Sequence, residues 1–370
     1  MASAITANQV RTVLDRLFKD GAKPTMFLSS FASVRKTSAA AIAVDILRNK
    51  EEYAVDIIPG AGSRSNKKAR WTTKEYIPPL YSESDSLTAQ ELQKRLPGVN
   101  AFDQSDMSYA TQAIKIASDK QIDLQDKILR AIELQARDAY FSGQIELLNG
   151  DTIDFKKKTT HGITPTTDWA DATGTPLDDI SDACALIRKD GLVQANRYRL
   201  IVADDVVEVL KANAQMVEKA NLRRVNNVEM DRVSDINDLG AVRHGEFDAG
   251  RYIIELWTYP QFYDVPEGFG FANEGTKQPY IPSGEALLLP AGGIDLRLWF
   301  AGVPTMLNQV EPEAAAAVGG LSVPTLAEAD FVPWIIGDDR KKCIELGVDS
   351  APLFVPVQID GFCTFDTLLG

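Results

Sequence analysis

Histidine and cysteine, the side chains that most often bind metals or move protons, are scarce in this sequence and far apart. The chain has two histidines, His161 and His244, each beside a glycine in a turn-like setting. The three cysteines, Cys184, Cys343 and Cys363, show neither metal-site spacing nor an even count. We therefore expect no metal site and no cofactor, and we expect the thiols to be reduced and partly buried.

Motifs for nucleotide, metalloprotease or acyl chemistry are also missing. The chain lacks the GxxxxGK, HExxH and GxSxG patterns, and the glycines at 60–62 lack the third glycine of a dinucleotide site. Asp204 and Asp205 follow a predicted strand, where a metal or a ribose could bind. The simpler interpretation is that both begin a helix, whose dipole favours negative charge at this end. We predict that the protein is not an enzyme; an α/β enzyme with a site near Asp204 stays open as an alternative.

Composition narrows the function classes further. The net charge is −13, whereas a protein that grips nucleic acid by its phosphates normally carries a basic excess. No apolar run approaches the ~20 residues of a membrane helix, and residues 1–18 read as an amphipathic helix rather than a signal peptide. A length of 370 residues is too great for one compact core. Two domains or one elongated subunit are expected.

The strongest structural signal is one long amphipathic helix, predicted at about 107–141. Its apolar residues recur three and four positions apart and form one stripe. Ser142 and Gly143 supply a C-terminal stop, and a small hairpin follows, with strands at 145–148 and 152–155. Because one stripe needs one partner, the helix is expected to lie across a sheet or another helix. The stripe residues that we expect to pack there include Leu124, Ile128, Ile132 and Ala136.

A second hairpin is predicted upstream, with strands at 53–58 and 71–77. It has too little apolar surface for a core of its own, so it should lie on something else. Its tip is basic. Either the tip is a solvated turn, or it is an arm that reaches an acidic patch on an adjacent subunit. The candidates for such inter-subunit contact are Arg64, Lys67, Lys68, Arg70 and Trp71.

The rest of the chain reads as a mixed α/β unit followed by strands. A helix is predicted at 179–189 and another from 204 to 213 that is followed by a further helix. The predicted strands of this unit are 198–203, 241–247, 252–259, 286–290 and 296–301. The tail from residue 350 alternates apolar and other residues, which is typical of strands that close a sheet.

The order of these parts is more specific than any one motif. Six stretches occur in sequence between residues 24 and 365: PTMFLSSF, FSGQIELLNGDTIDF, FDAGRYIIELWTYPQFYD, YIPSGEALLLPAGG, LRLWFAGVP and SAPLFVPVQIDGF. In these stretches and in their order, the chain resembles tailed-phage major capsid proteins, which have the Hong Kong 97-type fold. More closely, it resembles the lambda-type family, the phage major capsid protein E family.

This resemblance implies an α+β fold whose parts have established names. They would be an N-terminal arm (1–50), an E-loop hairpin (51–85), a P-domain (86–177) with the spine helix, an inserted mixed α/β A-domain (178–330), and return strands of the P-domain (331–370). The family has no catalytic residues to carry over. Residues 304–330 have no place in the family pattern.

The resemblance also implies a function. The chain would self-assemble into pentamers and hexamers that form an icosahedral head shell around double-stranded DNA. Its partners would be other copies of itself, a scaffolding protein, a portal at one vertex and, through weak nonspecific contacts, the packaged DNA; a decoration protein stays open, and no membrane is involved. The protein would belong to the virion after assembly in the host cytoplasm. An encapsulin-like compartment for protein cargo is the alternative.

Overall fold

The computed structural model describes most of the chain from residue 26 to residue 367, and structural statements below concern these residues only. The described ranges are 26–29, 33–47, 71–88, 90–91, 109–148, 150–191, 193–221, 228–230, 240–269, 271, 273–292, 294–306, 324–338 and 343–367.

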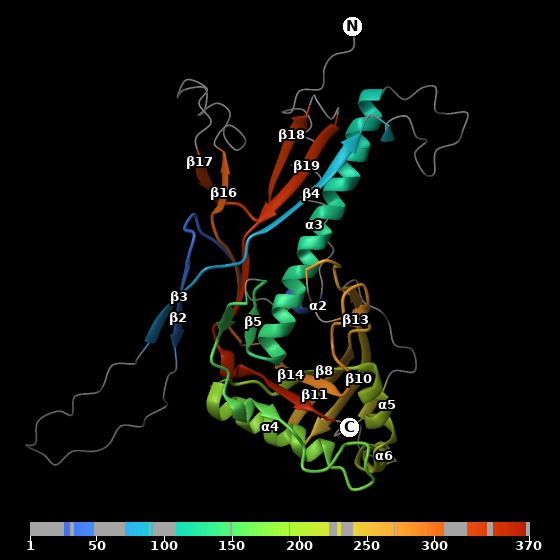
Figure 1. The fold of residues 1–370 in the computed structure, drawn as a ribbon. Helices are drawn as coiled ribbons and strands as arrows, with labels where there is room; N and C mark the ends of the chain where they lie inside the picture. Colours follow the sequence, from blue (N-terminus) through green and yellow to red (C-terminus); the bar gives the residue numbers. More distant parts are fainter. Residues whose placement is uncertain are drawn as a thin grey trace, which may run out of the picture.

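One long helix, α3 (Tyr109–Phe141), dominates the molecule (Figure 1). The sequence predicted it within two residues at its start, because its apolar stripe is periodic over the whole length. At ~1.5 Å per residue it is about 50 Å long. It ends where a stop was predicted: Gly143 has φ 71°, and the Ser142 hydroxyl donates to the Asp138 carbonyl at 2.7 Å. A residue other than glycine rarely adopts such a backbone angle.

The small hairpin follows α3 directly, as predicted. Strands β5 (Gln144–Glu146) and β6 (Thr152–Asp154) pair antiparallel. Their turn is closed by the Leu147 amide, which donates to Asp151 O at 2.8 Å. Ile145 and Ile153 are directly opposite each other and both are buried, so one face of the hairpin packs on the body of the protein.

At the lower end of α3 lies a seven-stranded mixed sheet (Figure 1). Helix α4 (Pro176–Gly191) covers it through an apolar face, and α6 (Ala214–Asn221) contacts both α4 and α5 (Asp204–Ala212). A short 3-10 turn, η3 (Thr159–His161), leads into its first strand. In order across the sheet, the strands are β7 (Gly162–Ile163), β21 (Cys363–Asp366), β14 (Glu285–Pro290), β8 (Arg197–Val202), β11 (Tyr252–Thr258), β10 (Val242–Ala249) and β9 (Val228–Met230).

Two three-stranded sheets lie along α3. One joins β18 (Val332–Asp338), β19 (Cys343–Ser350) and β4 (Tyr81–Thr88), all antiparallel. The other has β15 (Leu296–Phe300) between β1 (Ser33–Lys36) and β20 (Pro352–Pro356). A short turn, η4 (Ile359–Gly361), connects β20 to β21. Both sheets bring together segments that are hundreds of residues apart in the sequence.

Two-stranded ribbons and one short helix complete the described fold. The ribbons pair β2 (Ile42–Leu47) with β3 (Trp71–Tyr76), β12 (Phe262–Asp264) with β13 (Lys277–Pro279), and β16 (Val303–Met306) with β17 (Pro324–Ala327). The short helix α2 (Met26–Ser29) packs against α3. Within the described chain, no helix is both long and apolar enough to cross a lipid bilayer.

Two expectations about strand pairing differ from what the structure shows. The strand at 71–76 was expected to pair with 53–58; in the structure it pairs with β2, from Ile42↔Tyr76 to Leu47↔Trp71. Residues 53–58 lie outside the described ranges. In addition, β15 belongs to the predicted A-domain by position but pairs with β1 and β20, whereas β21 from the predicted return strands lies in the seven-stranded sheet. Sheet pairing therefore crosses the predicted boundary at residue 330, and the domain limits stay predictions.

Candidate functional site

The predicted inter-subunit residues fall almost entirely outside the described chain. This holds for Arg64, Lys67, Lys68 and Arg70. Only the backbone of Trp71 is placed, as the first residue of β3 opposite Leu47. Contact of this segment with another subunit stays a prediction from the sequence.

The apolar stripe of α3 is buried at all four positions that we singled out. Leu124, Ile128 and Ile132 expose 2% or less and form a small cluster on the helix side of the flanking sheets, completed by Leu298, Phe300 and Val348. Ala136 lies further along and belongs to the main core instead. Burying such side chains contributes roughly 1.5–3 kcal/mol each for the larger ones, so this stripe attaches the helix to both three-stranded sheets.

Polar side chains also attach α3, and the sequence analysis missed them. Glu133 is fully buried and accepts the Phe27 amide of α2 at 2.8 Å. Gln135 is buried as well; its amide nitrogen donates to the Tyr81 hydroxyl at 2.8 Å and to Pro352 O at 3.4 Å. Because a buried polar group that lost its partner would cost about 1–3 kcal/mol, these bonds fix the rotation of the helix against its neighbours. Their only signal in the sequence is an acidic or amide residue adjoining the apolar stripe.

Lys157 connects the end of α3 to the seven-stranded sheet. Its ammonium group donates to the carbonyl oxygens of Tyr140 (2.9 Å) and Phe141 (3.0 Å), the last two residues of the helix, and to the Thr364 hydroxyl of β21 (2.8 Å). A cation at this position complements the negative end of the helix dipole. Burial lowers the pKa of Lys157 to about 8, against the opposing effect of Cys363 and Glu285. The residue is a structural joint between the two parts of the protein.

A second joint surrounds His161, which was predicted to lie in a turn and is fully buried. One ring nitrogen, Nδ1, lies 2.9 Å from Phe362 O, and the other, Nε2, lies 3.3 Å from the Asp190 carboxylate. Lys158 also contacts Asp190, at 2.9 Å. The hydrogen bond from Lys158 is the main reason why the pKa of Asp190 is lowered. The cluster ties η3, the end of α4 and the start of β21 together.

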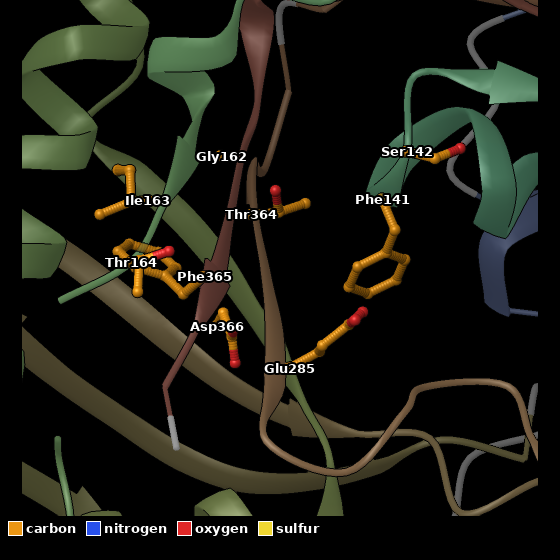
Figure 2. Close-up of a pocket in the computed structure, with 9 residues that line it drawn as sticks. All are labelled: Phe141, Ser142, Gly162, Ile163, Thr164, Glu285, Thr364, Phe365 and Asp366. Carbon is orange, nitrogen blue, oxygen red and sulfur yellow. The ribbon is translucent and has the colours of Figure 1, made fainter. Parts of the chain in front are cut away.

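A cavity of about 340 Å³ lies between the end of α3 and the edge of the seven-stranded sheet (Figure 2). Its two carboxylates, Glu285 of β14 and Asp366 of β21, are directly opposite in the strand register. Burial raises the pKa of Glu285, and the charge of Asp366 adds to this effect. Two of the three hydroxyls in its wall are engaged elsewhere: Ser142 in the helix stop and Thr364 with Lys157. The wall is formed by Phe141, Ser142, Gly162, Ile163, Thr164, Glu285, Thr364, Phe365 and Asp366.

Asp204 and Asp205 begin helix α5, which is the simpler of the two interpretations that the sequence allowed. The Asp205 carboxylate accepts a hydrogen bond from the Ser283 hydroxyl and another from the Gly284 amide, at 3.0 Å. It therefore fixes the loop before β14. His244 lies 2.9 Å from the Thr258 hydroxyl of the neighbouring strand.

In the part of the chain that the structure describes, no three His, Cys, Asp or Glu side chains are grouped as a metal site. All three cysteines are free; Cys184 and Cys363 are buried, and Cys343 is half-buried. Burial raises the pKa of Cys363 to about 12, so its thiol is a packing group rather than a nucleophile.

The arrangement of parts is shared with a solved prophage protein. The structure matches a prophage protein of E. coli CFT073, described as a capsid protein, with TM-score 0.66 and 16% identity. The match covers 99% of each chain. A phage-related protein of Bordetella bronchiseptica RB50 matches over 97% of both chains, with TM-score 0.49 and 11% identity. The search of curated protein sequences gave no match. The fold is that of Hong Kong 97-like capsid subunits, as the sequence predicted.

The model of the family described as phage major capsid protein E matches residues 13–367. Since that match covers nearly the whole sequence, the chain belongs to this family, and the resemblance seen in the sequence is confirmed. The family points to a structural role in the virion.

Proposed function

We propose that this protein is the subunit of an icosahedral head shell, arranged in pentamers and hexamers around double-stranded phage DNA. The observation that carries the proposal is the β2–β3 ribbon, which projects from the body (Figure 1) and has only two strands. A two-stranded ribbon is marginally stable in water by itself. A neighbouring subunit would give it a surface to lie on, and repeated contacts of this kind close into rings.

The charge of the chain agrees with a container for DNA. At −13, the subunit would hold packaged DNA only through weak, nonspecific contacts. We propose a scaffolding protein during assembly and a portal at one vertex as further partners, and assembly in the host cytoplasm. These partners are carried over from the family.

Electron microscopy of the purified protein tests the proposal directly. We expect closed shells, or free pentamers and hexamers, once the protein is concentrated under assembly conditions. Ile132→Asp, which puts a carboxylate into the buried cluster on α3, should give none. A wild-type chain that stays monomeric under all conditions would contradict the proposal.

The contents of the particles distinguish a phage head from a compartment for protein cargo. Particles purified from a phage lysate should contain nuclease-protected double-stranded DNA. Particles filled with one enzyme and free of DNA would favour the encapsulin-like alternative.

A further inference from the structure

The short helix α2 lies beside α3 (Figure 1) and is held there by side chains of two other segments. The Phe27 side chain is fully buried, and Met26 exposes only 7% of its surface. The ring of Phe27 contacts Tyr140 of α3, with centroids 5.9 Å apart, and Tyr259, the residue after β11, at 5.6 Å. A helix of four residues is not stable by itself in water. Its position therefore depends on these contacts.

A buried carboxylate adds polar contacts to the packing of α2. Glu133 of α3 is fully buried and accepts the Phe27 amide at 2.8 Å. The Tyr259 hydroxyl donates a hydrogen bond to the same carboxylate and accepts one from the Met26 backbone. Burial is the main reason why the pKa of Tyr259 is raised, and the charge of Glu133 adds to this effect. Because a buried carboxylate needs its donors, the positions of α2, α3 and Tyr259 are set together.

A row of tyrosine rings leads from α2 to the β12–β13 ribbon. Tyr259 packs against Tyr280, which follows β13, with ring centroids 5.4 Å apart. Tyr280 in turn packs against Tyr263 of β12, at 5.2 Å. The Tyr280 amide donates to the Gln261 carbonyl at 3.1 Å, next to the start of β12. Both strands of the ribbon are therefore connected, through these rings, to the residue that contacts Phe27.

Helix α3 holds both ends of this row of rings. Arg137 donates to the Tyr263 hydroxyl at 3.3 Å, and its guanidinium lies 5.9 Å from the centre of the ring. Arg137 is four residues after Glu133, so the two side chains lie on the same face of the helix. Glu133 thus holds α2 and Tyr259, while Arg137 holds Tyr263. Loss of α2 would open this closed arrangement at its first member.

The β12–β13 ribbon carries exposed aromatic rings. We call the described residues between its two strands the aromatic loop. Phe269 and Phe271 of this loop expose 57% and 44% of their surface, and their ring centroids lie 6.1 Å apart. At the base of the loop, the Gly275 amide donates to Val265 O and the Val265 amide to Thr276 O, both at 3.0 Å. These bonds extend the ribbon, so they are stable only while β12 and β13 are held.

We infer that α2 is a latch that holds the aromatic loop in one shape. While α2 is in place, the three tyrosines keep one packing, and the exposed rings of the loop are presented in one arrangement. When α2 leaves, Glu133 loses a donor at a buried position and Tyr259 loses the ring of Phe27. The tyrosines then repack and the loop opens locally, as weakly held units of a fold do. A movement of α2 would thus change an exposed surface elsewhere on the subunit.

Hydrogen–deuterium exchange of the unassembled full chain tests the latch. Phe27→Ala removes the ring that α2 contributes, and we expect the amides at the base of the aromatic loop to exchange about tenfold faster. Phe155→Ala is the matched control, because Phe155 is also buried and also packs against a tyrosine, Tyr76, outside the latch. It should leave exchange in the loop unchanged. No acceleration in Phe27→Ala, or equal acceleration in both variants, would overturn the inference.

A second pair of variants acts on the buried carboxylate. Glu133→Ala removes the acceptor of the Phe27 amide and should speed exchange in the aromatic loop as Phe27→Ala does. Glu133→Gln keeps an acceptor oxygen at this position and should retain most of the protection. Equal acceleration in the two variants would show that the hydrogen bond to α2 does not hold the loop.

The wild-type chain allows a measurement without any substitution. If α2 is a latch, the Phe27 amide and the amides at the base of the aromatic loop open in one step. Their exchange, followed amide by amide by NMR, should then show the same dependence on low concentrations of urea. It should be faster than exchange in β19, which lies in another sheet. A Phe27 amide that opens independently of the loop would overturn the inference, whether or not the variants fold. The test needs no shells, so its result is separate from that for the proposed function.

Discussion

The two halves of helix α3 carry the same apolar stripe but are held in different ways. The C-terminal half enters the main core, where Tyr140 is fully buried and its ring packs against Phe27, Phe354 and Phe362 at 5.1–5.9 Å. The N-terminal half lies on thin sheets, over small clusters, and uses ion pairs at its margin: Lys120 contacts Asp85 at 3.2 Å and Glu91 at 3.0 Å.

Because of this difference, the two halves of the helix are attached with unequal stability. Large, close-packed cores are costly to disturb, so the C-terminal half fixes the helix to the seven-stranded sheet. Partly exposed ion pairs contribute little, about 0–1 kcal/mol. The N-terminal half is therefore attached by smaller apolar clusters and weak ion pairs, and less firmly than the C-terminal half.

The largest effect is expected about two-thirds of the way along α3, where the two kinds of packing meet. Ile132→Asp buries an unpaired carboxylate in the cluster of Leu124, Ile128, Leu298, Phe300 and Val348, at a cost of about 4 kcal/mol or more. Loss of soluble protein and of shells is expected, measured by sedimentation and thermal denaturation. Lys115→Asp, at an exposed position of the same helix, is the control. Normal shells from Ile132→Asp would refute the placement of the stripe.

A substitution at Gly143, where α3 stops, should be nearly as destabilising. A Cβ at Gly143 would lie 2.5 Å from the Cβ of Lys157, and φ there is +71°. Gly143→Ala is therefore expected to lower the free energy of unfolding by about 3 kcal/mol, from backbone strain and the displaced lysine. Gly150→Ala, where φ is +84° but no atom lies within 4 Å, should cost only about 1 kcal/mol. Equal losses in chemical denaturation would show that the contact with Lys157 contributes nothing.

Removal of the lysine joint should have an intermediate effect. Lys157→Met leaves the carbonyls of Tyr140 and Phe141 without their donor and should cost about 2 kcal/mol at pH 7. Lys156→Met, whose side chain pairs with Asp154 at the surface, should cost no more than about 0.5 kcal/mol.

The same joint gives a pH dependence of defined sign. Burial lowers the pKa of Lys157 to about 8 in the folded protein, against about 10.4 in the unfolded chain. Between these values the unfolded chain binds more protons, so the Lys157 contribution to the free energy of unfolding rises with pH. The wild type minus Lys157→Met difference should therefore grow from pH 8 to pH 10 in urea titrations. A flat or falling difference would contradict the lowered pKa.

The smallest effect belongs to the N-terminal half. Lys120→Met removes its ion pairs with Asp85 and Glu91 and a hydrogen bond to Ser86 O, yet should cost only about 1 kcal/mol. The loss should shrink at high salt. A loss as large as that of Lys157→Met would remove the contrast between the two halves.

Local patterns in the sequence predicted much of this fold. Helix α3 and strands such as β8, β11 and β14 lie within one or two residues of their expected positions, because periodicity is a property of neighbouring residues. Which strands pair was not predictable in this way. β4 and β19 are more than 250 residues apart, and β1 joins β15, which no local signal indicates.

The joints between parts were the least predictable features. Lys157 was one of three successive lysines, and only the fold shows that it reaches the end of α3. His161 looked like a turn residue because glycine follows it, yet it is buried between η3, α4 and β21. The cause is the same in both cases: each side chain acquires its role from partners far away in the sequence.

The position of β21 has a consequence for the timing of synthesis. This strand lies between β7 and β14. Gly162 of β7 therefore cannot pair until Thr364 has been synthesised, 202 residues later. At roughly 5–20 residues per second on a ribosome, the delay is about 10–40 s. During that interval the sheet has a gap, and neither Lys157 nor His161 has its partner in β21. A half-made chain thus lacks the joints that fix the helix to the sheet, and competence for assembly comes late in translation.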